Sequence, residues 1–414
     1  MSKNNKGNVF AIAIMFFLFA MISFVTGLQN PMGIIAKAQF GATNLMSQLG
    51  NAANFIAYAF MGLPAGFLLK GKGYKFTALA AIAVGFIGVG ISYLSGIFGS
   101  FAIYLLGAFV SGFSMCMLNT VVNPMLNTLG GGGNRGNQLI QLGGSCNSLA
   151  ATIVPVLAGY LIGEVTEKTQ VADVNPALFT AMGIFALAFT IILFSNIPEP
   201  ELNESENQPK ENLLESVKGA VSHKNLVFGV IAIFLYVGIE VGIPNIANLY
   251  MTDVNGLNIA TGVAGTLVGA YWFLMLCGRL IAGAIGGKVS SRAMIISVST
   301  AGILFLLAGM FLPKSIIVNV LDAKVPFAIL FFILCGLCTS VMWGAIFNLA
   351  VEGLGKYTSI ASGLFMVMVC GGGILPLVQG AVVDYAGYMN SYWVLVAALG
   401  FILWFGLIGS RTNK

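Results

Sequence analysis

Long uninterrupted apolar runs constrain the fold of this chain more than any other feature. Each is about 20 residues or more, long enough for a helix to cross a hydrocarbon core of roughly 30 Å. The runs lack the two-residue alternation of a membrane-spanning barrel. With 58% hydrophobic and only 8% charged residues, the chain has too little polar surface for a soluble protein. We therefore predict an all-α integral membrane protein. Its twelve predicted spans are 9–36, 47–69, 75–97, 99–128, 138–163, 175–197, 224–251, 259–286, 293–312, 325–351, 358–383 and 389–410.

The basic residues favour one side of the predicted membrane. If the N-terminus is inside, the outer loops hold only Lys37, Lys168, Lys314 and Lys324, and the other loop and tail cations lie on the inner side. This bias places both termini in the cytoplasm. The net charge of +5 is then a topology signal and not a nucleic-acid footprint. We expect a multi-pass protein of a bacterial inner membrane.

A polar stretch divides the spans into two sets of six. Pro198–Lys224 reads as a cytoplasmic linker, in which Leu213–Val221 is expected to form a short helix on the inner surface. Short, glycine-rich basic loops follow the second and the eighth span, at corresponding places in the two sets. Paired halves imply a solute site between them near the midplane and rocking between two access states. We predict pseudo-symmetric halves at 1–197 and 223–414 with a linker at 198–222.

Glu240 is a lone carboxylate within the apolar stretch Leu226–Met251, whereas residues 1–163 contain no acidic residue. An ionisable group at bilayer depth costs a few kcal/mol, so it normally faces a cavity and has a function. Burial disfavours the charged form of a carboxyl group, which would suit a proton carrier. The alternatives are a fixed hydrogen-bond acceptor for a substrate hydroxyl and a charge held by a partner elsewhere in the chain.

Amide side chains recur inside several spans, and indole rings accompany them. Such amides either tie helices together or line a shared cavity, and both interpretations stay open for any single residue. Amides, one carboxylate and indole rings suit a neutral polyol. An organic anion would need an embedded cation, and only Arg279, toward the inner end of its span, qualifies. The embedded polar groups include Gln29, Asn30, Asn119, Asn123, Asn147, Asn245, Trp272, Trp343 and Asn348.

Other chemistry finds little support in the sequence. All six cysteines lie in apolar spans, and the one histidine, His223, lies in a loop. No nucleophile–base pair or metal-ligand cluster appears in the spans. We therefore expect no enzyme activity, no metal and no cofactor, with H⁺ as the candidate coupling ion.

Several stretches resemble the fucose–galactose–glucose:proton symporter family of the major facilitator superfamily. The most specific are YWFLMLCGRLIAGAIGG (271–287) and MWGAIFNLAVEGLGKYTSIASGLFMVMVCGGGILP (342–376), with others in the first half, among them PAGFLLKGKGYK (64–75) and LNTVVNP (118–124). The resemblance implies the major facilitator fold, alternating access and uptake of a hexose or deoxyhexose. It places Asn147, Glu240, Asn245, Trp272, Trp343 and Asn348 in the sugar cavity, and Lys70, Lys75 and Arg279 in the inner gating motif.

The chain departs from this family in its first half. Members similar to the fucose permease carry an acid in the first helix and a glutamate before Asn-Pro in the fourth. Here Gln29 and Asn30 stand in the first helix, and Asn119 stands at the glutamate position. An amide exchanges no proton near neutral pH, so Glu240 is the proton-coupling candidate that is left.

The resulting prediction is a monomeric, lipid-embedded transporter that takes up a neutral monosaccharide. An uncoupled sugar facilitator and an efflux transporter for another small solute are the alternatives. A membrane sensor that binds sugar without transporting it belongs to a different class, and the absence of any signalling domain argues against it.

Overall fold

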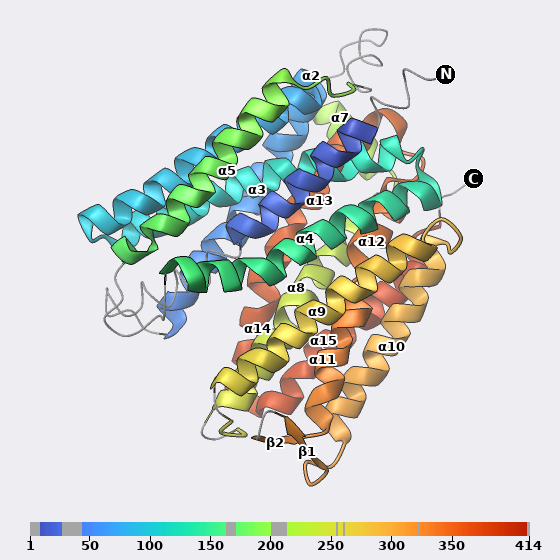
Figure 1. Cartoon of the computed structure of the whole chain (residues 1–414). Coiled ribbons are helices and arrows are strands. Elements are labelled where there is room, and N and C mark those ends of the chain that lie inside the picture. The colour runs from blue at the N-terminus through green and yellow to red at the C-terminus, as the bar shows by residue number, and fades with distance from the viewer. Residues whose placement is uncertain are drawn as a thin grey trace. The chain divides into compact units, whose positions relative to one another are not determined.

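A computed structural model of the chain is built almost entirely of helices (Figure 1). The structure describes residues 9–26, 44–162, 171–199, 213–253, 256–259, 261–320 and 323–411. The helices are Val9–Thr26, α2 (Asn44–Phe98), α3 (Phe101–Leu129), α4 (Gly133–Ile162), α5 (Asn175–Phe194), α7 (Leu213–Val221), α8 (Lys224–Thr252), α9 (Thr261–Ile285), α10 (Ser291–Phe311), α11 (Ala328–Thr339), α12 (Met342–Val351), α13 (Thr358–Val367), α14 (Gly371–Ala386) and α15 (Tyr388–Trp404). Strands β1 (Ile317–Val320) and β2 (Ala323–Pro326) pair antiparallel.

Ten described helical segments are long and apolar enough to cross a membrane. One of them, Ala52–Phe98, contains two helices joined at a kink at Gly73, where φ is 82°. Only glycine adopts this backbone conformation without strain, which is why the chain can reverse here without a longer loop. Counting the two arms separately and adding the 30-residue α4 gives the twelve predicted spans. The short helix predicted over Leu213–Val221 is confirmed as α7.

The sequence did not predict three local features. The β1–β2 hairpin lies between α10 and α11. The predicted span 325–351 is divided into α11 and α12 at Ser340 and Val341, and the span 358–383 is divided into α13 and α14 by a tight turn at Met368–Cys370. Gly371 starts α14 where a side chain would overlap the backbone of Phe234, so a glycine is needed for this close approach of α14 to α8.

The described residues form two compact units. The first takes them from Met1–Gly131, Cys146–Ser222 and Gly353–Cys370, and the second from Gly132–Ser145, His223–Glu352 and Gly371–Lys414. Each unit therefore follows one half of the sequence for most of its length and adds one segment from the other half. The added segments are the first part of α4, in the second unit, and α13, in the first.

Small side chains hold the helices of the first unit close together. A Cβ on Gly88 of α2 would lie 2.6 Å from the Ser111 hydroxyl of α3, and a Cβ on Gly66 would lie 3.0 Å from Gly363 of α13. Within a membrane, where apolar burial gives no net gain over lipid, such close backbone packing is a main source of helix association.

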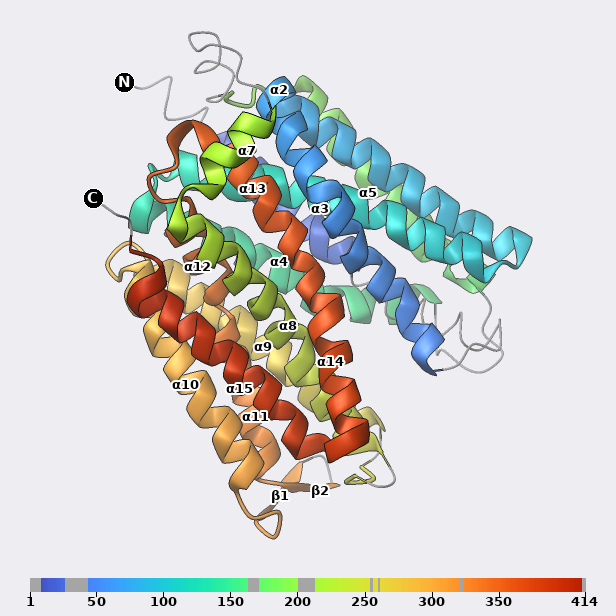
Figure 2. The same cartoon turned by 180° about the vertical axis from the view of Figure 1, so that it is seen from behind.

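Helix α8 is central to the second unit, where it packs against α9, α11, α12, α14 and α15 (Figure 2). Its first turn holds Asn225, whose amide donates to the carbonyl oxygens of Leu349, Ala350 and Glu352 at the end of α12. These carbonyls lack helical partners, so the amide satisfies acceptors that would otherwise be costly to bury. Phe332 of α11 and Tyr392 of α15 stack at 4.2 Å between ring centroids.

Candidate functional site

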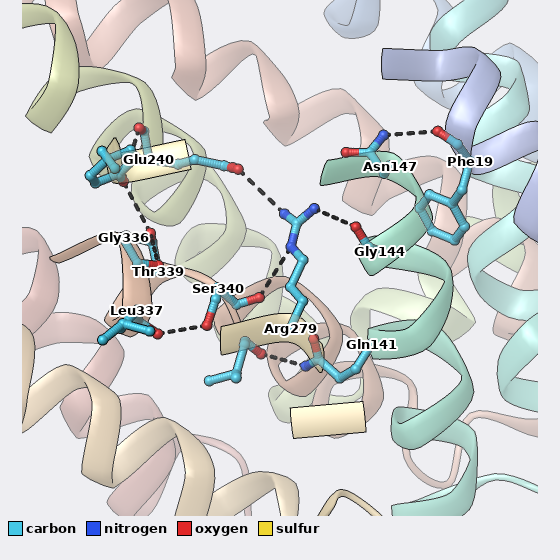
Figure 3. Close-up of polar contacts among 12 residues, drawn as sticks. Phe19, Gln141, Gly144, Asn147, Glu240, Arg279, Gly336, Leu337, Thr339 and Ser340 are labelled. Atoms are coloured by element: carbon cyan, nitrogen blue, oxygen red, sulfur yellow. Dashed lines mark hydrogen bonds and ion pairs between the residues drawn. The ribbon is translucent and has the colours of Figure 1, made fainter. Parts of the chain in front are cut away.

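An ion pair lies inside the second unit. Glu240 of α8 and Arg279 of α9 approach to 3.4 Å between Oε1 and Nη2 (Figure 3). Their side chains are 16% and 10% exposed. Removing two charges from water is expensive unless they are paired and hydrogen-bonded. Arg279 is thus the partner of the carboxylate that stood alone in the sequence.

The guanidinium of Arg279 also donates to two backbone carbonyls. Its Nη1 lies 2.9 Å from the Gly144 oxygen of α4, and its Nε lies 3.3 Å from the Ser340 oxygen (Figure 3). A Cβ on Gly144 would lie 3.4 Å from Arg279 Cδ, so the glycine leaves room for the arginine stem. The planar fork of an arginine reaches separate acceptors from three different nitrogens, whereas the three donors of a lysine radiate from a single nitrogen.

Glycines bring α9 and α11 together and so position the pair. A Cβ on Gly278 would lie 2.7 Å from Ser340 Cβ, and one on Gly336 would lie 3.1 Å from the Tyr271 carbonyl carbon. This contact places the Tyr271 hydroxyl 3.0 Å from Thr339 Oγ1 and 3.2 Å from the backbone oxygen of Glu240. The backbone on which Glu240 sits is therefore anchored to both α9 and α11.

Aromatic side chains surround the ion pair. Tyr236 lies one turn before Glu240, is fully buried, and meets the Trp343 ring edge-on at 6.2 Å. Its hydroxyl interacts with both the Glu240 carboxylate and the Arg279 guanidinium. Trp272 is half-buried and packs edge-on against Tyr271 at 5.3 Å. The second unit thus combines a charge pair with indole and phenol rings.

The first unit holds a neutral amide cluster. Asn119 Nδ2 donates to the Tyr58 hydroxyl at 3.1 Å and to the Met115 carbonyl at 3.2 Å. One turn later, Asn123 Nδ2 donates to the Asn119 carbonyl at 2.8 Å. Asn119 is 7% exposed and Asn123 is fully buried. These contacts are made to helix backbone and to a phenol.

The remaining predicted cavity residues are placed separately. Asn147 donates to the Phe19 carbonyl at 3.0 Å in the first unit (Figure 3). Asn348 is buried and donates to Ser291 Oγ at 2.9 Å, at the start of α10. Asn245 is exposed. Gln29 and Asn30 lie outside the described residues. The structure therefore brings Glu240, Arg279 and Trp343 into one neighbourhood and places Asn348 in a helix–helix contact.

The two predicted gating lysines lie around the kink at Gly73. Lys70 Nζ donates to Ser216 Oγ of α7 at 2.5 Å, and Lys75 Nζ donates to the Ser195 carbonyl at 2.9 Å. The Glu199 carboxylate accepts from the backbone N–H groups of Tyr74 and Lys75 at 2.6 and 2.8 Å. It therefore caps the second arm of α2, a role that suits an anion at a helix N-terminus. Glu199 was not predicted, because a linker acid carries no sign of its partner.

Among the described residues no group of three histidine, cysteine or acidic side chains could hold a metal ion, and the six cysteines are free. The twelve spans, the two units and the buried ion pair define a multi-pass helical membrane protein. The family model of the Major Facilitator Superfamily matches residues 12–376, so the chain belongs to that superfamily of transporters. The predicted superfamily and fold are confirmed.

Named relatives match the chain over nearly its whole length. A glucose/galactose transporter of Brucella abortus is 29% identical over 416 residues, covering 99% of this chain and 96% of the relative. An L-fucose-proton symporter of Escherichia coli is 21% identical and covers 94% and 90%. The crystal structure of the transporter FucP in its outward conformation superposes with a TM-score of 0.82 at 19% identity, covering 98% of this chain and all of that one.

Proposed function

We propose that this protein takes up a neutral monosaccharide of the fucose, galactose or glucose class by alternating access. The relatives named for these sugars span the whole chain, which supports this substrate class. The observation that carries the proposal is the pairing of Arg279 with Glu240. Among the described residues, Arg279 is the one buried cation that could attract an anion, and its charge is already compensated. A neutral solute is therefore favoured over an organic anion.

Glu240 is the proposed site of proton coupling. It is partly exposed, so a proton can reach it, and the cation beside it can stabilise its ionised form. Asn119 stands where similar symporters have a glutamate, and its contacts with Tyr58 and Met115 satisfy a neutral amide. The proposed mechanism is rocking of residues 1–197 against 223–414, with coupling through the second half alone. We further propose that the protein works as a monomer in the inner membrane with both termini in the cytoplasm and no nucleic-acid partner.

Transport in proteoliposomes tests this proposal. Labelled fucose, galactose, glucose and mannose are offered with and without an inward proton gradient. Accumulation of one sugar only with the gradient is expected. Equilibration that ignores pH would make the protein a facilitator, and export of another solute without flux of any sugar would contradict the substrate class. Tight sugar binding without flux would indicate a sensor.

Glu240→Gln isolates the coupling step. The variant is expected to lose uphill uptake and to keep sugar exchange, because the neutral amide can still hydrogen-bond but does not ionise near neutral pH. Glu352→Gln makes the same chemical change at an exposed side chain beyond the end of α12 and should leave uptake unchanged. Loss of sugar binding in Glu240→Gln would instead make this carboxylate a sugar ligand.

A further inference from the structure

The first part of α4 is held in the second unit by hydrogen bonds to backbone carbonyls and by a contact of Asn137 Nδ2 with Met294 Sδ at 3.5 Å. Gln138 Nε2 donates to the Gly283 carbonyl at 2.9 Å, Gln141 Nε2 donates to the Val341 carbonyl at 2.8 Å, and Arg279 Nη1 donates to the Gly144 carbonyl at 2.9 Å. The three α4 residues are spaced three apart and share one helix face. We call these three bonds the α4 clasp. One of its three donors is the charged side chain that also binds Glu240.

The corresponding segment of the other half is held differently. α13, which like α4 begins the fifth predicted span of its half, packs in the first unit through the glycine contact between Gly66 and Gly363. It also contacts α3, where Ser362 Oγ donates to the Thr120 carbonyl at 3.2 Å. Neither contact involves a charge. Between these two segments, the described contacts fasten only α4 by a group whose electrostatic partner can gain or lose a proton.

The geometry of the Arg279 side chain links Glu240 of α8 to Gly144 of α4. Ionised Glu240 draws Nη2 toward α8, and the rigid guanidinium plane then directs Nη1 at Gly144. Protonation of Glu240 removes that anchor and leaves an uncompensated cation in a buried site, which is strongly unfavourable unless the arginine moves. Gln138 and Gln141 are unaffected by this change, so the clasp weakens without being lost.

Few other groups act on the carboxylate. Tyr236 of α8 and Arg279 and Tyr271 of α9 are the titratable or charged side chains that interact with Glu240, and Cys335 of α11 faces Tyr271. Within the described residues, α12, α14 and α15 add no charged group that acts on Glu240. A change of charge at Glu240 is therefore passed chiefly to Arg279.

We propose that Arg279 is a positioning residue that transmits the protonation of Glu240 to α4 and loosens the α4 clasp. This inference rests on the proposed proton-coupled transport. It identifies α4 as the helix whose attachment changes when Glu240 is protonated, and it can be tested without any transported solute.

Disulfide trapping across the clasp provides the test. A Cβ on Gly283 would lie 2.9 Å from Leu142 Cγ, so Leu142→Cys with Gly283→Cys relieves the overlap and brings two sulfurs within bonding range. The pair is made in a chain whose six native cysteines are replaced by alanine. Cross-linking by an oxidant is measured without sugar, at one pH for all variants, because thiol reactivity itself depends on pH.

Glu240→Gln, which mimics the protonated state, should slow cross-linking roughly fivefold or more, the lower range of typical coupling between sites. Glu240→Asp, which keeps the charge, should retain more of the parent rate. Arg279→Lys should slow cross-linking and make it indifferent to Glu240→Gln, because lysine cannot reach both partners. Ser362→Ala, which removes the hydrogen bond from α13 to the Thr120 carbonyl of α3, should have no effect. Thermal melts confirm that each variant is folded.

Equal cross-linking rates with Glu and Gln at position 240 would overturn the inference. So would a dependence on residue 240 that persists unchanged in Arg279→Lys. If the cross-linking rate depends on the residue at position 240 while no sugar is transported, the inference about the α4 clasp holds and the proposed sugar transport fails. If sugar is accumulated with protons while the cross-link ignores Glu240, the proposed function stands and the clasp does not carry the signal.

Discussion

The buried polar groups of the two units differ in charge. In the first unit, Asn119 and Asn123 donate to a phenol and to carbonyl oxygens, and these contacts are satisfied whatever the pH. In the second unit, Glu240 and Arg279 carry full charges of opposite sign, and the arginine also holds two carbonyls. A neutral cluster can bind a solute or fix helices, but it cannot store a proton. We therefore propose that proton coupling begins in the second unit.

The largest effect is expected when the charged cluster loses its cation. Arg279→Leu leaves Glu240 as an uncompensated buried charge and frees two carbonyl acceptors, at a cost of about 3–5 kcal/mol in stability. Thermal unfolding in detergent should reveal the loss. Adding Glu240→Gln removes the unpaired charge, so the double variant should recover part of the loss. A double variant as unstable as Arg279→Leu alone would mean that the carbonyl contacts, and not the ion pair, dominate.

An acid placed in the neutral cluster is expected to have the next largest effect. Asn119→Glu introduces a carboxyl group beside the Tyr58 hydroxyl and the Met115 carbonyl, and insertion of a charged side chain at a helix centre costs roughly 2.5–3.5 kcal/mol. Protonation relieves this cost, so the variant should be more stable at low pH than at high pH, and uptake should gain a second pH dependence.

Asn119→Gln adds the same chain length without a titratable group and is the matched control. It should lose some stability from crowding but show no new pH dependence. If Asn119→Glu and Asn119→Gln show the same pH dependence, a titratable group at position 119 of the first unit has no influence on stability or uptake.

Local sequence patterns predicted the fold better than the site. Apolar length located the spans, and the glycine-rich basic stretch located the reversal at Gly73. The ion pair escaped prediction because periodicity tells which residues share a helix face and not which helices are neighbours. Arg279 lies near the end of α9 whereas Glu240 lies near the middle of α8, so their depths seemed different. A long arginine side chain reaches across that distance, which residue counting cannot show.

The amides illustrate a second limit. Asn348 and Asn245 look alike in the sequence, as polar groups in apolar spans. Asn348 is satisfied by Ser291 in a helix contact, whereas Asn245 is exposed. Only the position of a partner helix distinguishes an amide that ties helices together from one that is free to meet a solute, and that position depends on packing far along the chain.

Asn348→Ala tests whether this amide ties helices together or binds a solute, and its expected effect on stability is smaller than those above. Removing the amide leaves Ser291 Oγ without this donor and should lower stability by about 1 kcal/mol. Sugar affinity should be nearly unchanged, because the amide is occupied within the second unit. Asn245→Ala is the comparison, with little change in stability. A loss of sugar affinity in Asn348→Ala without a loss of stability would return this residue to the cavity.

The smallest expected change in stability concerns Gly144, the glycine that lies against the Arg279 side chain. Alanine is the better helix former by about 1 kcal/mol, so replacing an unobstructed helical glycine should stabilise the protein. Gly183 of α5 is such a position, because a Cβ there meets nothing within 4 Å. Gly144→Ala should gain less, since its Cβ would lie 3.4 Å from Arg279 Cδ and press on the stem that positions the guanidinium. Thermal melts of the two variants measure the difference. Equal stabilisation by Gly144→Ala and Gly183→Ala would mean that the Arg279 side chain adjusts freely. The space left by Gly144 would then not be what orients the guanidinium toward Glu240.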